Sequence, residues 1–304
     1  MTVVCVSSQQ SRELLGEVPD GVQVIVWNGE AERPEALART EFWVPQIEEP
    51  GDLPIMFAAM PELKVMQLTS AGIEDVAGRI PDGVTLCDAR GVHGGAVAEL
   101  VVLLILASLR ELPHFLAAQR AGHWDPEQAD DLPDKRVLIV GAGDLGDQTT
   151  RRLAGFDVTT MLVARTARDG VHAFTELPQL LPDADIVVLT LPLTDETTGM
   201  VDAPFLARMP DGALLINVAR GQIVDTDALL AELTAGRLRA GLDVVDPEPL
   251  PDGHPLWSAP NVIITPHAAG HVRRSGSRAF ALVNDQLRRY LAGEKLINVV
   301  DGAY

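Results

Sequence analysis

The sequence predicts an α/β protein made of two parallel-sheet domains, one of which is inserted into the other. Three observations predict this arrangement. Short apolar runs alternate with helical patterns along most of the 304 residues. A glycine-rich turn directly follows one of those runs, after residue 140. A long helical pattern separates an N-terminal series of runs from a second series. This length is sufficient for two domains of ordinary size.

The first series contains four expected strands, separated by turn residues such as Pro19-Asp20-Gly21 and Pro81-Asp82-Gly83. The strands are expected at residues 2–7, 22–27, 63–69 and 84–88. A single long helix is then expected over residues 96–121. Its first half is apolar nearly all round, which is typical of a helix buried on several sides, as between two domains. The polar residues 124–133 are expected to form a loop.

The second series begins at Lys135 and ends in a helix expected over residues 274–292. Its strands are expected at residues 136–140, 158–163, 185–191, 213–219, 238–244 and 262–265. The first of them runs directly into Gly141-Ala142-Gly143-Asp144-Leu145-Gly146, which has the spacing of a dinucleotide-binding fingerprint between a strand and a helix. Its glycines permit a tight turn and close approach to a pyrophosphate, and the helix N-terminus supplies N–H groups. The alternative is a purely structural glycine turn.

We therefore expect a dinucleotide-binding domain at residues 96–270. Residues 1–95 and 271–304 are expected to form a smaller domain that binds the substrate, with the two long helices as the hinge.

Composition limits the possible partners. The net charge of −19 argues against nucleic acid or an anionic membrane surface, because both are bound by clustered Lys and Arg. Cys5 and Cys87 lie in apolar segments and are expected to be buried free thiols. No signal-peptide pattern, CxxC pair or metal site is expected, and the longest apolar stretch, residues 100–106, is far below the roughly 20 residues that span a bilayer. We expect a cytoplasmic, reducing location.

The end of the second strand in the dinucleotide domain indicates which cofactor is bound. A site for NAD carries Asp or Glu about 20 residues after the fingerprint, where it accepts from the ribose 2′-hydroxyl. Here Ala164 stands at that place, and Arg165, Thr166 and Arg168 follow it. Arginine guanidinium groups can clamp a 2′-phosphate, so the sequence predicts NADP(H) in preference to NAD(H). A solvated basic loop is the alternative.

Three charged residues lie just after expected strands of this domain. Arg220, Glu248 and His267 follow the strands at residues 213–219, 238–244 and 262–265. Because the carboxyl ends of parallel strands line the ligand crevice, the three should meet at one edge. This combination suits reduction of a 2-oxo acid. The guanidinium can bind a carboxylate, and a carboxylate bonded to the imidazole favours the imidazolium form, which keeps a proton donor loaded. Structural roles are the alternatives: a salt bridge for Arg220, a strand-end histidine and a loop charge.

Several motifs, taken as a set, resemble the D-isomer-specific 2-hydroxyacid dehydrogenase family. In chain order they are Gly141 to Gly146, Leu191-Pro192-Leu193-Thr194, Asn217-Val218-Ala219-Arg220-Gly221, Val224-Asp225, Gly241-Leu242-Asp243-Val244 with Glu248-Pro249, and His254-Pro255-Leu256-Trp257 through Thr265-Pro266-His267-Ala268-Ala269-Gly270. The N-terminal segment matches more loosely, through Ser70-Ala71-Gly72 and Val97-Ala98-Glu99.

The resemblance implies a fold, a reaction and roles for residues. The fold is a Rossmann doubly wound sheet inserted into a smaller flavodoxin-like domain, commonly in a homodimer. Arg220 binds the 2-oxo acid, His267 protonates its carbonyl oxygen, Glu248 bonds His267, and Asp243 holds the nicotinamide carboxamide. Backbone N–H groups of Ser70, Ala71 and Gly72 receive the substrate carboxylate. The remaining implied cofactor contacts are Leu191, Pro192, Thr197, Val218, Ala219, His267 and Gly270.

Departures from the family pattern bear on the substrate. His93 stands in a segment where many members carry Thr, so a phosphate contact is absent or His93 serves the substrate side. The acid-to-Arg change resembles NADPH-using glyoxylate/hydroxypyruvate reductases, whereas the substrate loop lacks the Gly-Val-Asp-Asn run of phosphoglycerate dehydrogenases. The rival hypotheses are a dehydrogenase for a larger 2-oxo acid or phosphite, and a dinucleotide-sensing scaffold resembling C-terminal-binding-protein corepressors. Candidate pocket residues, whose roles the sequence leaves open, are Trp43, Trp257 and Arg273, and the role of His271 is open too.

Overall fold

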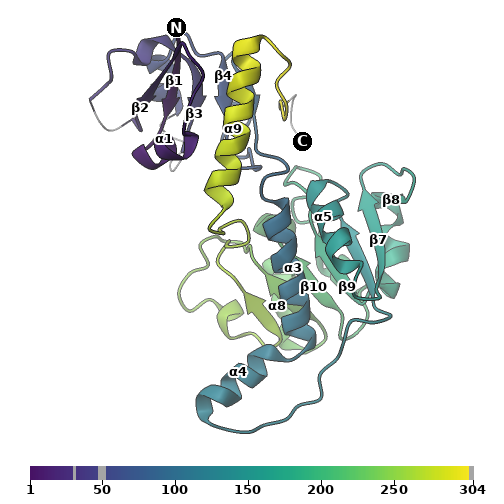
Figure 1. Cartoon of the computed structure of the whole chain (residues 1–304). Coiled ribbons are helices and arrows are strands. Elements are labelled where there is room, and N and C mark those ends of the chain that lie inside the picture. Colours follow the sequence, from purple (N-terminus) through teal and green to yellow (C-terminus); the bar gives the residue numbers. More distant parts are fainter. Residues whose placement is uncertain (30–31, 47–52, 301–304) are drawn as a thin grey trace. The chain divides into compact units, whose positions relative to one another are not determined.

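The computed structural model describes residues 1–29, 32–46 and 53–300. The chain divides into two compact units (Figure 1). The smaller comprises Met1–His93 and Val272–Tyr304, and the larger comprises Gly94–His271. The boundaries expected from the sequence, after residues 95 and 270, lie within two residues of these.

The smaller unit contains a five-stranded parallel sheet in the order β2-β1-β3-β4-β5. Its strands are β1 (Thr2–Val6), β2 (Val22–Val26), β3 (Thr40–Val44), β4 (Val65–Gln67) and β5 (Thr85–Cys87). Its helices are α1 (Gln9–Leu15), α2 (Leu53–Ala59) and α9 (Ser275–Ala292), with a short 3₁₀ turn at Leu37–Arg39. The strand order is that of flavodoxin-like folds, as predicted, and the order reverses between β1 and β3.

Strand β3 was not expected from the sequence. It is a short run that carries a charge, Glu41, at its second position. That charge is neutralised from distant parts of the chain, because the Lys64 ammonium lies 2.6 Å from the Glu41 carboxylate and the Tyr290 hydroxyl donates to it at 2.7 Å. The hydrogen bonds from Lys64 and then Tyr290 lower the pKa of Glu41.

Helix α9 covers one face of this sheet and brings the C-terminal part of the chain to the N-terminal strands (Figure 1). Phe280, Val283 and Leu287 pack against strand residues there. Gln286, which is fully buried, extends the contact with polar bonds. Its amide nitrogen donates to Gln67 Oε1 and to the Ile297 carbonyl, each at 2.8 Å, and its oxygen accepts from the Ile297 N–H at 2.9 Å. Burying amides is favourable only when they are hydrogen-bonded, so this network fixes α9 and the segment after it to β4.

The larger unit contains a seven-stranded parallel sheet in the order β12-β11-β10-β9-β6-β7-β8. Its strands are β6 (Arg136–Val140), β7 (Thr159–Ala164), β8 (Val171–Ala173), β9 (Ile186–Leu189), β10 (Leu214–Asn217), β11 (Arg239–Leu242) and β12 (Val262–Ile264). The chain builds outward from β6 in one direction and returns to β9 to build in the other. This is the doubly wound arrangement predicted from the sequence, with β8 as a short edge strand that was not expected.

The expected single helix over residues 96–121 is wrong. The chain forms α3 (Gly94–Leu109) and α4 (Leu112–Ala121), separated at Glu111, whose backbone is left-handed with φ +50°. Pro113 explains the break. Proline has no N–H to donate and its ring collides with the carbonyl four residues earlier, so a helix cannot continue through it. Arg239 stabilises the junction by donating to the Ser108 carbonyl and pairing with Glu111.

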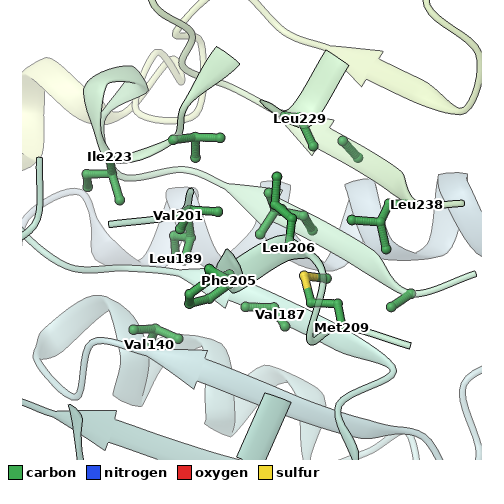
Figure 2. Packing of buried hydrophobic residues seen from close by; sticks show 14 of the residues in the cluster. Val140, Val187, Leu189, Val201, Phe205, Leu206, Met209, Ile223, Leu229 and Leu238 are labelled. Carbon is green, nitrogen blue, oxygen red and sulfur yellow. The ribbon is translucent and has the colours of Figure 1, made fainter. Parts of the chain in front are cut away.

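Both faces of the larger sheet are covered, as parallel sheets require. On one face, α7 (Ala203–Leu206) and α8 (Thr226–Thr234) pack on the strands. Figure 2 shows Phe205 and Leu206 beside Val187 and Leu189, and Leu229 on the other side of Leu206. On the other face lie α3 and α5 (Asp144–Leu153). The remaining short helices are α6 (Leu177–Leu180) and 3₁₀ turns at Phe174–Glu176, Leu181–Asp183, Gly221–Ile223 and Pro255–Ser258.

Both cysteines are buried and unpaired, as expected. Burial raises the pKa of the Cys5 thiol to about 12 and that of Cys87 to about 11, so neither forms a thiolate near neutral pH. Within the described ranges, none of the helices combines the length and the apolar character needed to cross a membrane.

Candidate active site

The three charged residues singled out from the sequence follow neighbouring strands. Strand β10 pairs with β11, and β11 pairs with β12, all in parallel. Arg220 follows β10, Glu248 follows β11 and His267 follows β12. The predicted adjacency of these strands is therefore confirmed, and all three residues lie beyond the carboxyl edge of one sheet.

His267 and Glu248 form a close pair. The imidazole Nδ1 lies 2.6 Å from the Glu248 carboxylate, and the side chains are 50% and 35% exposed. Because an ionised carboxylate only accepts hydrogen bonds, Nδ1 carries the hydrogen in this pair. The other ring nitrogen, Nε2, is then the atom that can exchange a proton with a bound molecule.

Asp243 holds the backbone around His267. The backbone of His267 is left-handed, with φ +49°, a conformation that non-glycine residues rarely adopt. Its N–H donates to the Asp243 carbonyl at 2.7 Å. The buried Asp243 carboxylate accepts from three further donors of the same loop: the Thr265 hydroxyl at 2.5 Å and the N–H groups of Ala268 and Ala269 at 2.9 and 3.1 Å. These bonds fix the imidazole's position, and Thr265 is a functional residue that the sequence reasoning missed.

Arg220 is presented by a turn that Asn217 organises. The buried Asn217 amide donates to the Arg220 carbonyl at 2.9 Å, and its oxygen accepts from the Ala219 N–H at 3.0 Å. The Arg220 guanidinium is half-buried and donates to the Ala219 carbonyl at 2.7 Å. Val218 and Ala219 are buried beneath this turn, so their side chains serve packing.

The glycine-rich loop after β6 has the shape that a dinucleotide pyrophosphate needs. A Cβ at Gly141 would lie 2.6 Å from the Thr190 backbone, and one at Gly146 would lie 2.1 Å from the Gly141 carbonyl oxygen. Gly141 also has φ +120°. A Cβ at Gly143, in contrast, would meet nothing within 4 Å, so the chain leaves open space at the N-terminus of α5. The loop therefore fits a phosphate group approaching the helix N-terminus.

Asp144 and Leu145 open α5, but the Asp144 carboxylate turns away from the loop. It lies where a Cβ on Gly94 would stand, within 2.1 Å, and the Gln148 amide donates to it at 3.4 Å. An Asp144 contact with a dinucleotide would therefore use the backbone N–H and not the carboxylate.

The basic residues after β7 lie beside the glycine-rich loop. The Arg168 guanidinium donates to the Ala142 carbonyl at 2.6 Å, which brings the positive charge to the loop. Arg165 and Thr166 are exposed, and Ala164 ends the strand. No carboxylate stands at the end of β7, because its last residue is Ala164 and the next are Arg165 and Thr166.

The loop after β9 shows a different role for one expected contact. Leu191 and Thr197 are buried. The Thr197 hydroxyl donates to the Pro192 carbonyl and accepts from the Thr194 N–H, each at 2.8 Å. It thus fixes the loop that follows the switch between β6 and β9. Gly270 is half-buried at the end of the His267 loop.

Ser70, Ala71 and Gly72 belong to the smaller unit, where they follow β4. Ser70 and Ala71 are exposed, and the Ser70 hydroxyl donates to the Gly72 carbonyl at 3.0 Å. Of the pocket candidates, Trp43 lies in β3 and is 2% exposed against Phe57, so it is a core residue. Trp257 is half exposed and donates to the Pro251 carbonyl, and Arg273 and His271 are exposed.

Comparison with known proteins identifies the family. The family model described as "D-isomer specific 2-hydroxyacid dehydrogenase, NAD binding domain" matches residues 102–269. The chain belongs to this family. It is accordingly an NAD(P)-dependent oxidoreductase that interconverts 2-oxo and 2-hydroxy acids, as the motifs predicted.

Two relatives named as reductases resemble the chain over most of their length. A glyoxylate reductase of Thermofilum pendens is 36% identical over 258 residues, which are 80% of this chain and 76% of that protein. The glyoxylate reductase/hydroxypyruvate reductase of Homo sapiens is 31% identical, over 81% and 79% of the two chains. The chain spans only about half the length of the D-3-phosphoglycerate dehydrogenase of Mycobacterium tuberculosis, which is 32% identical.

Solved dehydrogenase structures share the whole fold. The D-isomer specific 2-hydroxyacid dehydrogenase of Xanthobacter autotrophicus Py2, in complex with NADPH and MES, has a TM-score of 0.85 at 33% identity and covers 99% of this chain and 98% of its own. The NADPH-dependent glyoxylate/hydroxypyruvate reductase of Sinorhizobium meliloti, in complex with NADP and sulfate, has a TM-score of 0.86 at 29% identity, with coverages of 99% and 98%.

Proposed function

We propose that this dehydrogenase is an NADPH-preferring reductase of small 2-oxo acids, with glyoxylate or hydroxypyruvate as substrate and the D-2-hydroxy acid as product. The observation that carries the proposal is the 2.6 Å contact between His267 and Glu248, which follow β12 and β11, with Arg220 after the neighbouring strand β10. A proton donor and a carboxylate-binding cation are the two groups that such a reduction needs from the protein.

Each residue of the site has a separate role in the proposed reduction. The Glu248 carboxylate accepts from Nδ1 and so fixes the orientation of the imidazole. Nε2 of His267 gives its proton to the carbonyl oxygen of the acid. A dinucleotide held by the glycine-rich loop after β6 and the basic residues after β7 would supply the hydride. The Arg220 guanidinium binds the acid's carboxylate, and Ser70 to Gly72 offer it backbone N–H groups. Local positive charge is needed here because the chain as a whole carries −19.

The preference for NADPH rests on the residues after β7. A carboxylate at that strand end would repel a 2′-phosphate, and Ala164 stands there. Arg165, Thr166 and Arg168 offer donors, with Arg168 already directed to the glycine-rich loop. Structural neighbours that hold NADPH or NADP support the proposal.

Kinetics with both cofactors test the proposal. Glyoxylate, hydroxypyruvate, pyruvate and a branched or aromatic 2-oxo acid are each assayed with NADPH and NADH. We expect the highest kcat/KM for glyoxylate or hydroxypyruvate with NADPH, and Arg220→Ala should chiefly raise KM for the acid. Equal or better use of NADH would contradict the cofactor preference. No NADPH oxidation with any acid would favour the dinucleotide-sensing scaffold, and turnover of larger acids or phosphite alone would favour the other rival.

We also propose a homodimer in the cytoplasm. Helix α4 has no buried residue, and its Leu112 and Leu116 are each 41% exposed. Trp124, just after it, is 97% exposed. A second copy would remove this apolar surface from water. Light scattering coupled to size-exclusion chromatography would overturn the dimer if the mass were that of one chain.

A further inference from the structure

In the loop of the smaller unit from Leu68 to Gly72, four carbonyl groups accept hydrogen bonds from other groups of the protein. The donors are two side chains from outside the loop, one backbone N–H and one hydroxyl within it. The four bonds are Gln67 Nε2 to Leu68 O (2.8 Å), His93 Nε2 to Thr69 O (2.8 Å), Ala89 N to Ser70 O (2.8 Å) and Ser70 Oγ to Gly72 O (3.0 Å).

Two backbone N–H groups of the same loop differ from these carbonyl groups in their hydrogen bonding. In the part of the chain that the structure describes, the N–H groups of Ser70 and Gly72 donate to no other group. A loop with backbone N–H groups that donate to no other protein group can receive an anion. Its orientation depends on the carbonyl bonds, since a peptide plane that rotates moves its oxygen and the following N–H together.

The loop also lies at the edge of the small sheet where a ligand is expected. It follows β4, and Thr69 lines a cavity of about 170 Å³ together with Ser8 after β1 and Gln46 after β3. Strands β1 and β3 are where the strand order reverses, and open α/β sheets bind ligands at the carboxyl ends beside that point.

We propose that His93 is a positioning residue for the substrate carboxylate. A carbonyl oxygen cannot donate, so Nε2 carries a hydrogen and donates it to Thr69. Thr69 precedes Ser70, so this bond fixes the plane of the peptide that contains the Ser70 N–H. His93 therefore acts through the loop backbone and without touching the acid. The proposal rests on the proposed function, because it takes the bound anion to be the carboxylate of a 2-oxo acid.

His93 is the donor that can be altered with least disturbance of the core. Gln67 is fully buried and bound to Gln286, and Ala89 donates through its backbone. His93 is only half-buried. His93→Phe removes the donor and keeps a ring, whereas His93→Gln keeps a donor, because the glutamine amide nitrogen is reached through the same number of bonds as Nε2.

The test combines kinetics with binding on the full chain loaded with NADPH. For His93→Phe we expect KM for glyoxylate and Kd for oxamate, an unreactive analogue, to rise about 3- to 10-fold, the value of one hydrogen bond. KM for NADPH and kcat should stay within about twofold. His93→Gln should restore the wild-type values of KM for glyoxylate and Kd for oxamate. His172→Phe, at another half-buried histidine, is the control and should change neither KM for glyoxylate nor Kd for oxamate. If His93→Phe does not fold, His93→Ala against His93→Gln makes the same comparison.

The outcomes separate this proposal from the function it rests on. Unchanged KM and Kd in His93→Phe, with normal glyoxylate turnover by the wild type, would overturn the role of His93 alone. A parallel loss of kcat and NADPH affinity that His93→Gln does not restore would also overturn it. A wild type that reduces no 2-oxo acid would overturn the function, and calorimetric oxamate binding would still decide whether His93 orients the loop.

Discussion

Two of the histidine–carboxylate pairs in the larger unit have short hydrogen bonds of similar length. His267 Nδ1 lies 2.6 Å from Glu248, and His172 Nδ1 lies 2.8 Å from Glu176. The second pair is local, since its partners are four residues apart beside the edge strand β8. Glu176 there also accepts from the Ala173 N–H. The first joins loops after two neighbouring strands, beside Arg220. The contact itself thus does not distinguish the two pairs, whereas their places in the sheet do.

The largest expected difference between the pairs comes from removing each imidazole. His267→Gln should lower kcat by about 10²- to 10⁴-fold, the usual contribution of a general acid. His172→Gln should leave kcat within about twofold, because β8 lies at the far edge of the sheet from β12. Steady-state assays of both variants measure the contrast, and a loss under about threefold in His267→Gln would remove His267 from the chemistry.

Removing the carboxylate should also lower kcat more for Glu248 than for Glu176. Glu248→Gln keeps a hydrogen-bond acceptor but removes the negative charge that lies 2.6 Å from Nδ1 of His267. The loss in kcat should be about 10- to 100-fold, as for a hydrogen bond to a charged group. Glu176→Gln serves as the matched control and should leave kcat unchanged. Equal kcat values for the two variants would show that the partner's charge has no part in the reaction.

A smaller effect on kcat should follow from removing one hydrogen bond in the loop that carries His267. Thr265→Val removes the hydroxyl that donates to Asp243, while two backbone N–H donors to Asp243 remain. We expect kcat to fall about 3- to 10-fold, with KM for NADPH unchanged. Thr265→Ser should recover most of the rate, since it keeps the hydroxyl. If Thr265→Ser were as slow as Thr265→Val, the hydrogen bond would not be the cause.

The smallest effect concerns stability and belongs to the local pair. The Ala173 N–H and then His172 lower the pKa of Glu176 in the folded state. A lowered pKa stabilises the fold above the unfolded value of about 4.3, and this contribution is lost as pH falls through the folded value. Glu176→Gln should therefore lower Tm slightly at pH 7, and the difference should shrink as pH falls below about 4.3. A difference that did not shrink as pH was lowered would contradict the charge-based explanation.

The sequence was sufficient for features that depend on local patterns. The doubly wound sheet and the adjacency of its strand ends were predicted from the glycine spacing from Gly141 to Gly146 and from the apolar runs before Arg220 and His267. This was possible because strand ends and turns depend on residues that are close together in the sequence. The lack of an acidic residue at position 164, from which the cofactor preference was predicted, is likewise visible in the local sequence.

Features that depend on distant partners could not be predicted. Strand β3 accommodates Glu41 only because Lys64 and Tyr290 reach it, and burial together with Glu41 raises the pKa of Tyr290 to about 12. Trp43, whose role the sequence left open, lies in this strand and belongs to the core. The Thr265–Asp243 bond joins residues 22 positions apart. The break before α4, in contrast, had a visible signal in Pro113.

The Gln286–Gln67 bond has a consequence for the order in which the protein acquires its structure during synthesis. Residues 94–271 form the larger unit from one continuous stretch, so that unit can fold while the ribosome is still adding residues. The smaller unit needs Gln286 and the segment at Ile297, which are made after the whole of the larger unit. Its N-terminal strands must therefore wait through the synthesis of the whole larger unit before α9 covers them. A truncation that removes α9 should leave those strands exposed to aggregation and to proteases, while the dinucleotide-binding unit stays folded.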